Sequence, residues 1–239
     1  MIDHLPKAIL LDLDDTILAD SESARYSWQT VSEQFAPRIG CTPDELLATI
    51  REYAHWYWSD PERHHRGRLD LNTSRREIVA AALPRMGIDN PSLAAEIAQA
   101  HHDLRDATVK PFDGAIDVLR SFRDRGLRLA LITNGNGDLQ RQKIERFGLA
   151  TFFDCILIEG EFGMGKPDER VYRHALDQLN VTPSEAWMVG DNLEFDVAAP
   201  QRLGIYSIWV DVTGNGLPAS SAVRPDRIIR TLSELLLRT

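Results

Sequence analysis

The feature that most constrains the fold is a series of short apolar segments, separated by segments with helical periodicity. These apolar segments are residues 8–11, 127–133, 155–158, 186–189 and 205–210. Continuous apolar runs of this length are typical of strands buried on both faces. Helices between such strands imply right-handed crossovers within a parallel sheet. The sequence therefore predicts an α/β fold with a doubly wound, Rossmann-like parallel sheet, and an edge strand is expected at Ile228-Ile229.

A long stretch between Ser21 and Lys110 has a different character, because it shows helical periodicity and no strand pattern. Helices are expected at residues 21–37, 42–56, 75–86 and 91–108. Thr42, followed by Pro43 and Glu45, marks the clearest helix start. Helices without strands pack most simply as a bundle. We therefore expect an α/β core formed by residues 1–20 and 110–239, with an inserted all-helical domain at residues 21–109.

Charge and cysteine content limit the kind of partner that the chain can bind. The 239 residues carry a formal net charge of −9, which argues against nucleic-acid binding because that needs a basic face. Cys41 and Cys155 lie far apart without metal-ligand spacing, which favours free thiols in a reducing compartment. The N-terminus lacks the pattern of a signal peptide, and no apolar run is long enough to span a membrane. We expect a cytoplasmic protein without nucleic-acid or membrane partners, and with no indication of oligomeric state.

The predicted strands share a second property, since several of them end in polar groups. Asp12 and Asp14 follow the first strand, Thr133-Asn134 the second and Asp191 a later one, while Lys166 lies in a glycine-rich loop. The carboxyl ends of parallel strands meet at one edge of the sheet, so these groups should converge. Two carboxylates on one side of an extended chain repel each other unless a cation lies between them, and Mg²⁺ suits such a site. Together with a hydroxyl, a lysine and backbone N–H donors, they supply what phosphoryl transfer requires.

These polar groups lie in four short motifs. The motifs are D-L-D-D-T from Asp12, I-T-N-G around Thr133, G-K-P-D around Lys166 and V-G-D-N-L-E-F-D around Asp191. In this order they resemble the four motifs of the haloacid dehalogenase-like hydrolase superfamily, and the helical insertion resembles its cap domain. The resemblance implies that Asp12 is the nucleophile and forms an aspartyl-phosphate. It also implies that Asp14 protonates the leaving alcohol and then activates water.

The same resemblance implies binding roles for the remaining motif residues. The residues that would bind the phosphoryl oxygens are Thr133, Asn134 and Gly135. The residues that would surround Mg²⁺ are Asp12, Asp14 through its main-chain carbonyl, Asp191 and Asp196. Lys166 would neutralise both the nucleophile and the transferring group, and Asp196 would support either Lys166 or the metal.

Members of this superfamily catalyse different reactions, so the residues must separate the alternatives. Haloacid dehalogenases generally lack a second carboxylate at the position of Asp14, because carbon–halogen cleavage needs neither a proton donor nor magnesium. Phosphosugar mutases keep both aspartates, and the sequence does not distinguish water from a sugar hydroxyl as the final acceptor. A non-catalytic binding protein on this fold would lack a key group, and none is missing. The sequence therefore predicts a magnesium-dependent phosphatase of a small phosphorylated metabolite.

The cap carries a local excess of basic residues that bears on the substrate. From Arg51 to Arg76 there are six arginines against four acidic residues. Caps of this kind supply specificity contacts, so Arg66 and Arg68 are candidate ligands for an anionic or hydroxylated leaving group. The alternative is that they are solvated loop residues or pair with nearby acids. Sugar phosphates, phosphoglycolate-like acids and nucleoside monophosphates all remain open as substrates.

Overall fold

The computed structural model describes residues 6–236 and divides into two compact units. The α/β unit contains the chain up to Ala19 and from Lys110 onward, and the helical unit contains Asp20–Val109. The chain leaves the α/β unit at Ala19 and returns at Lys110, where the N–H of Ala19 donates to the carbonyl of Lys110 at 2.9 Å. Among the described residues, no helix has the length and apolar character needed to cross a membrane.

The α/β unit is built on a six-stranded sheet in the order β3-β2-β1-β4-β5-β6, and every neighbouring pair is parallel. The strands are β1 (Ala8–Leu11), β2 (Arg128–Thr133), β3 (Cys155–Ile158), β4 (Ala186–Gly190), β5 (Tyr206–Val210) and β6 (Arg227–Ile229). Successive strands run outward from β1 in one direction and from β4 in the other, which creates a switch point between these two strands. The doubly wound parallel sheet expected from the sequence is confirmed.

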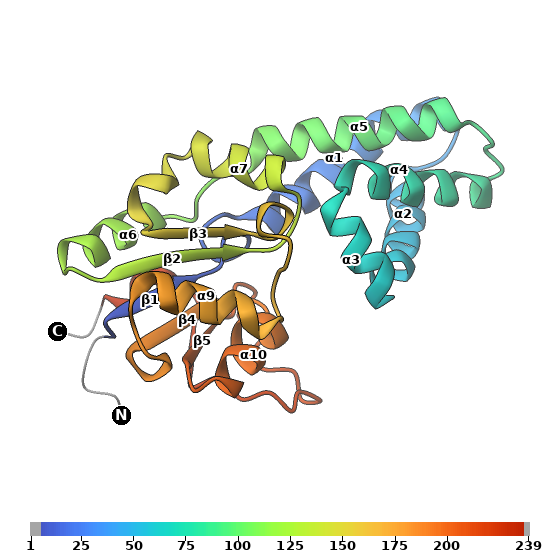
Figure 1. Cartoon of the computed structure of the whole chain (residues 1–239). Helices are drawn as coiled ribbons and strands as arrows, with labels where there is room; N and C mark the ends of the chain where they lie inside the picture. Colours follow the sequence, from blue (N-terminus) through green and yellow to red (C-terminus); the bar gives the residue numbers. More distant parts are fainter. Residues whose placement is uncertain (1–5, 237–239) are drawn as a thin grey trace. The chain divides into compact units, whose positions relative to one another are not determined.

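Both faces of the sheet are covered by helices, as Figure 1 shows for α6 and α7 on one side and α9 and α10 on the other. Ala8 and Leu10 belong to the cluster that packs against Tyr172 and Leu176 of α9. Alternate residues of a strand point to opposite faces, so a strand covered on both sides must be apolar at every position. Strand β1 fits this requirement, since all four of its residues are apolar and fully buried.

The helices of the α/β unit connect its strands. They are α6 (Ala115–Asp124), α7 (Gly137–Arg146), α8 (Glu159–Phe162), α9 (Glu169–Leu179) and α10 (Ala199–Arg202). Short 3₁₀ segments lie at Leu149–Phe152, Pro183–Glu185 and Leu232–Leu235, and a π-helical segment at Leu193–Ala198. The sequence also predicts a short final helix that ends at Thr239. The structure has a 3₁₀ turn at Leu232–Leu235, and Thr239 lies outside the described residues.

The helical unit is all-helical, as expected. Its helices are α1 (Asp20–Ile39), α2 (Pro43–Trp58), α3 (Pro61–Leu69), α4 (Leu71–Ala82), the 3₁₀ segment Leu83–Met86 and α5 (Pro91–Thr108). The predicted start of α2 is confirmed, since Thr42 and Glu45 form a reciprocal capping box. Phe35, Ile50 and Ile97 contribute to its apolar core.

The sequence predicts no helix between Trp56 and Ser74, but the structure shows that this segment is largely helical. Asp60 caps α3 by accepting the N–H of Arg63 at 2.8 Å, and Pro61 occupies the first helical position. Asp70 caps α4 in the same way, which starts that helix at Leu71 rather than at residue 75. Within α3 only Gly67 is buried, so this helix lacks the apolar periodicity by which helices are predicted.

Candidate active site

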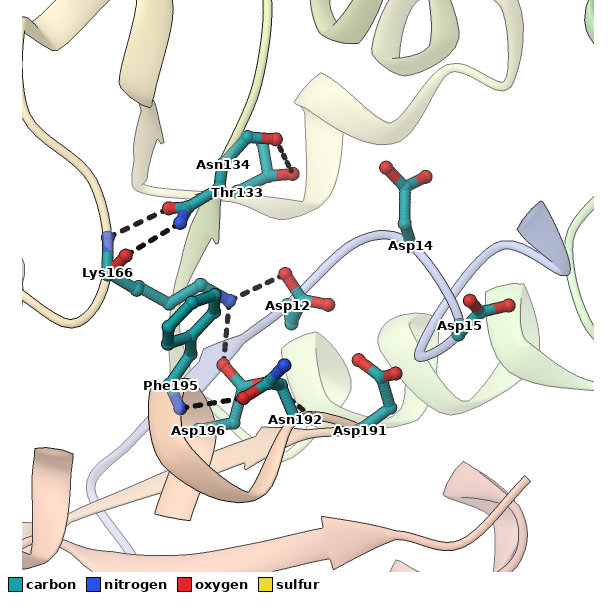
Figure 2. Close-up of a pocket in the computed structure, with 10 residues that line it drawn as sticks. All are labelled: Asp12, Asp14, Asp15, Thr133, Asn134, Lys166, Asp191, Asn192, Phe195 and Asp196. Atoms are coloured by element: carbon teal, nitrogen blue, oxygen red, sulfur yellow. Dashed lines mark hydrogen bonds and ion pairs between the residues drawn. The ribbon is translucent and has the colours of Figure 1, made fainter. Parts of the chain in front are cut away.

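A pocket of about 180 Å³ opens among the loops that follow β1, β2 and β4. It is lined by Asp12, Asp14, Asp15, Thr133, Asn134, Lys166, Asp191, Asn192, Phe195 and Asp196 (Figure 2). All of these residues belong to the α/β unit. The pocket lies at the switch point of the sheet, where open α/β folds place their ligands. The structure thus brings the polar ends of the predicted strands together with Lys166.

Lys166 lies between two carboxylates at the bottom of this pocket. Its Nζ donates to Asp12 Oδ1 at 2.6 Å and to Asp196 Oδ1 at 2.7 Å (Figure 2). Lys166 is 2% exposed and Asp12 is 7% exposed. Burial acts to lower the pKa of Lys166, but the charges of Asp12 and Asp196 outweigh it and raise that pKa above its usual value. Lys166 therefore stays charged and holds both aspartates in place.

The loop that carries Lys166 is fixed to the end of β2 by a reciprocal pair of hydrogen bonds. Asn134 donates its amide to the carbonyl of Lys166 at 2.7 Å and accepts the N–H of Lys166 at 2.8 Å. A Cβ at Gly165 would lie 2.5 Å from Asn134 Oδ1 and 2.7 Å from Glu159 Cδ. Only glycine at position 165 therefore allows the loop to approach Asn134 and Glu159 so closely. The Asn134 side chain holds this loop in place through its two hydrogen bonds to Lys166.

Asp196 reaches Lys166 from the π-helical segment after β4. Its Oδ2 accepts the N–H of Asn192 at 3.0 Å, so both of its oxygens are engaged. A Cβ at Gly190 would lie 2.2 Å from Asp196 Cγ. Gly190 is needed because Asp196 packs directly over the end of β4. Of the two alternatives that the sequence offered for Asp196, the geometry matches support of Lys166.

Asp191 has a different environment from Asp12 and Asp196. Its carboxylate has no hydrogen bond or ion pair with any residue that the structure describes, although one of its oxygens lies within 4.8 Å of one oxygen of Asp12 and of one oxygen of Asp196. Its main-chain carbonyl accepts Trp209 Nε1 at 2.6 Å, which fixes the backbone. Trp209 lies in an apolar strand, which predicts a core residue, and it is buried but also supports the site through this hydrogen bond. Asp191 is a carboxylate held among carboxylates without a cationic partner of its own.

The electrostatics of the pocket reflect this surplus of negative charge. Burial, followed by the charges of Asp12 and Asp196, raises the pKa of Asp191 to about 9. Burial also raises the pKa of Asp12 to about 7, against the opposing charge of Lys166. Carboxylates that are costly to ionise together are stabilised by a proton or by a bound cation. The carboxylate oxygens of Asp12 and Asp191 therefore fit a divalent ion.

Asp14 faces helix α7 rather than Lys166. Its carboxylate accepts Gln140 Nε2 at 2.9 Å and Lys143 Nζ at 2.7 Å. Gln140 also donates to Thr133 Oγ1 at 2.6 Å. Because β1 ends at Leu11, the chain is not extended through Asp14, yet Asp12 and Asp14 both line the pocket. Their different partners give the two carboxylates different chemical environments.

Sequence reasoning missed Gln140, Lys143 and the buried Glu159. The N–H of Gly135 donates to Glu159 Oε2 at 3.0 Å, and Gly135 is not among the residues that line the pocket. A buried carboxylate thus accepts the hydrogen bond of the Gly135 N–H in this structure, and the phosphoryl-binding role of Gly135 stays a prediction. The sequence signal that could have pointed to Gln140 and Lys143 is that they are two polar residues one turn apart in the helix that follows β2.

Arg66 and Arg68 lie on α3 in the helical unit. Arg66 is 4.0 Å from Glu77, and both side chains are exposed. Arg68 donates to the Nδ1 atoms of His64 and His65 at 3.2 and 3.1 Å. These partners belong to the same unit, and substrate contacts by either arginine remain a prediction.

Comparison with known families identifies this fold and site. The family model described as haloacid dehalogenase-like hydrolase matches residues 6–204, a range that holds all four motifs. The chain belongs to this family.

Relatives of this hydrolase support the phosphatase branch of the family. The chain is 35% identical to a phosphoserine phosphatase of Thermus thermophilus, over 97% of this chain and 98% of that protein. It is 31% identical to a glyceraldehyde 3-phosphate phosphatase of Methanopyrus kandleri, over 85% of this chain and 83% of that protein. Its structure matches the magnesium-bound crystal structure of the putative HAD-hydrolase YfnB of Bacillus subtilis with a TM-score of 0.75, at 21% identity and over 97% of each chain. The resemblance that the motifs indicated is confirmed.

Proposed function

We propose that this HAD-like hydrolase removes the phosphoryl group from a small phosphomonoester through an aspartyl-phosphate on Asp12, and that it requires Mg²⁺. The observation that carries the proposal is the presence of two carboxylates with separate partners in one pocket. Asp12 is bound to the buried Lys166, and Asp14 to Gln140 and Lys143. A nucleophile and a separate proton donor are what a phosphatase of this family needs.

The donor set supports magnesium as the cation. Asp12 and Asp191 each offer a carboxylate oxygen, and we assign these with the main-chain carbonyl of Asp14 as the protein ligands. Asp196 uses both oxygens for Lys166 and Asn192, so it positions the lysine. When bound, Mg²⁺ neutralises the negative charge that Asp12 and the substrate phosphate would otherwise bring together.

The residues then divide the reaction into two displacements. Asp12 attacks phosphorus with the carboxylate oxygen that Lys166 leaves free, while Asp14 transfers its proton to the departing alkoxide. In the second step Asp14 takes a proton from water as the water oxygen attacks phosphorus. The bond to Asp12 breaks, and inorganic phosphate leaves with Asp12 regenerated. Throughout, Lys166 and Thr133 stabilise the charge on the phosphoryl oxygens.

The substrate is proposed to be a small phosphorylated metabolite. The two relatives are named for phosphoserine and for glyceraldehyde 3-phosphate, which differ in functional groups but share a three-carbon phosphomonoester. A substrate of that size suits a pocket of about 180 Å³.

A substrate panel tests the proposal directly. Purified protein would be assayed against O-phosphoserine, glyceraldehyde 3-phosphate, sugar phosphates, nucleoside monophosphates, p-nitrophenyl phosphate and 2-chloropropionate, each with Mg²⁺ and with EDTA. We expect release of inorganic phosphate with Mg²⁺ and none with EDTA. Turnover of 2-chloropropionate alone, unaffected by EDTA, would replace the phosphatase by a dehalogenase. Transfer of phosphate to a sugar hydroxyl without release would indicate a mutase.

A further inference from the structure

One buried amide of the α/β unit contacts both the predicted phosphate-binding hydroxyl and the predicted acid–base residue. Gln140 of α7 is 4% exposed. Its Nε2 donates to Thr133 Oγ1 at 2.6 Å, to Asp14 Oδ2 at 2.9 Å and to the main-chain carbonyl of Asn134 at 3.2 Å. An amide –NH₂ carries two hydrogens, so these three acceptors share them. All four residues belong to the α/β unit, and the arrangement is complete within it.

The neighbours of Gln140 determine which end of its amide faces them. The main-chain carbonyl of Asn134 can only accept a hydrogen bond. The carboxylate of Asp14, whose other oxygen accepts Lys143 Nζ at 2.7 Å, also acts as an acceptor. A reversed amide would place its own oxygen against these acceptors and would repel both. The –NH₂ end therefore faces them, and Thr133 Oγ1 beside them meets a donor.

The hydroxyl of Thr133 accepts from Gln140 and must direct its own hydrogen elsewhere. Thr133 is 2% exposed and lines the pocket. Its hydroxyl lies 3.5 Å from the main-chain carbonyl of Asn134 (Figure 2), which is longer than the usual O–H···O hydrogen bond. The hydroxyl hydrogen is thus available to a stronger acceptor in the pocket. A charged phosphoryl oxygen is such an acceptor.

We propose that Gln140 is a positioning residue, which makes Thr133 a hydrogen-bond donor to the substrate phosphate and holds Asp14 with the same amide. The proposal rests on the proposed phosphatase function, because it takes a phosphoryl group as the ligand of the pocket. It adds a residue outside the four motifs. Phosphate binding and proton transfer to the leaving group then depend together on one side chain that touches neither the phosphorus nor the alcohol.

Two substitutions of Gln140 test the direction of this hydrogen bond. Gln140→Glu keeps the size of the side chain, but its carboxylate accepts the Thr133 hydrogen and repels Asp14 at a pH above the usual pKa of glutamate. The Kd of inorganic phosphate should rise on the order of 10- to 100-fold, the range for a hydrogen bond to a charged group. Gln140→Met should raise it only roughly 2- to 10-fold, because the hydroxyl can still turn toward phosphate. The rise in melting temperature with phosphate concentration, at saturating Mg²⁺, measures each Kd.

Gln142→Glu is the matched control, because it makes the same change at an exposed position of the same helix. It should leave the phosphate Kd within about twofold of the wild type, since surface charges contribute little. In a Thr133→Val background, Gln140→Met should change the Kd by less than about twofold, because the hydroxyl that it directs is gone. Additive losses in that double variant would overturn the proposal, as would a Kd for Gln140→Glu no higher than for Gln140→Met.

Activity supplies a second measurement and separates this proposal from the proposed reaction. Gln140→Met should lower kcat for an alkyl phosphate more than for p-nitrophenyl phosphate, because Asp14 loses a contact and only the alkoxide needs its proton. Phosphate binding that both Gln140 variants weaken, in a protein that hydrolyses no phosphate ester, would support the positioning role and reject the phosphatase. Hydrolysis by the wild type, with an unchanged phosphate Kd in both Gln140 variants, would keep the phosphatase and reject the positioning role.

Discussion

Lys166 Nζ binds Oδ1 of Asp12, and Oδ2, the oxygen that we assign to the attack on phosphorus, accepts among the described residues only a long hydrogen bond from Thr16 Oγ1 at 3.5 Å. We expect Asp12→Asn to abolish turnover, with a loss on the order of 10⁴-fold or more, because an amide cannot form the aspartyl-phosphate. Steady-state phosphate release under saturating Mg²⁺ measures the loss. The melting temperature should stay close to that of the wild type, since Asn still accepts from Lys166. Substantial hydrolysis by a preparation free of contaminating phosphatase would remove Asp12 as the nucleophile.

Asp14 is expected to act differently, because its role depends on the leaving group. Asp14→Asn should cost on the order of 10²–10⁴-fold in the first step with an alkyl phosphate, whose alkoxide needs a proton. The loss should shrink for p-nitrophenyl phosphate, whose leaving group is already stable. The second step still lacks its base, so phosphoenzyme should accumulate and appear as a burst of p-nitrophenol. Equal losses for both leaving groups, without a burst, would contradict the acid–base role.

Individual motif residues could be predicted because each followed an apolar strand of a parallel sheet. Asp12, Thr133 and Asp191 meet at one edge for that topological reason. Gln140 and Lys143 could not be predicted in the same way. They occupy ordinary polar positions of a surface helix, and only the packing of α7 beside the pocket brings them to Asp14.

At the scale of elements, the packing of α1 on α5 buries an imidazole. His101 of α5 stacks on Trp28 of α1, with ring centroids 3.7 Å apart, and its Nδ1 lies 2.8 Å from Ser27 Oγ. Burial, followed by the charges of Arg75 and Arg105, lowers the pKa of His101 from 6.5 to about 2. Between these two values the unfolded chain binds a proton that the folded chain does not, so stability rises with pH up to about 6.5 and falls on acidification.

This contrast predicts a pH dependence that one substitution removes. Between pH 6 and pH 4, the free energy of unfolding should fall about 1.4 kcal/mol per pH unit more steeply in the wild type than in His101→Asn. Urea unfolding at several pH values measures both slopes. His55→Asn, which replaces an exposed histidine of α2, should keep the wild-type slope. Parallel slopes for the wild type and His101→Asn would show that burial leaves this imidazole free to ionise.

Elements were predictable where local signals and tertiary packing agree. The sequence predicts a strand at residues 155–158 and a helix at residues 169–179, and the bounds of β3 and α9 match them, because each combines a clear apolar pattern with flanking polar residues. Helix α3 was not predicted, since its sequence PERHHRGRL is polar all round and its end caps provide the main local signal. The sequence predicts a helix before Gly204 but not the π-helical turn at Leu193–Ala198 within it, because that irregularity accompanies the placement of Asp196 beside Lys166.

For the molecule as a whole, the unpartnered Asp191 makes stability depend on a cation. Without Mg²⁺, Asp191→Asn should melt above the wild type, because the folded wild type must either ionise Asp191 beside Asp12 and Asp196 or keep it protonated at a pH where the unfolded chain releases the proton. Relief of about 1 kcal/mol corresponds to roughly 2–4 °C in a chain of this size. Saturating Mg²⁺ at about 100 times its Kd should stabilise the wild type by about 2.7 kcal/mol, and Asp191→Asn should lose that shift. Thermal unfolding with EDTA and with Mg²⁺ measures both effects.

Asp177→Asn provides the matched control, since it removes an exposed carboxylate of α9 that is not among those lining the pocket. It should melt like the wild type in EDTA and keep the full magnesium shift. If Asp191→Asn keeps the shift as well, the ion binds elsewhere.

The hydrogen bond between Ala19 and Lys110 joins the two points at which the chain leaves the α/β unit and returns to it. Because the two ends already meet, the sheet does not depend on the length of the insertion, and loop closure grows costlier only slowly with that length. Mutations in the helical unit can therefore accumulate, or one insertion can replace another, without disturbing the strands that carry Asp12 and Asp191. In evolutionary terms, the strands that carry the pocket and the inserted helices can change at different rates within one gene.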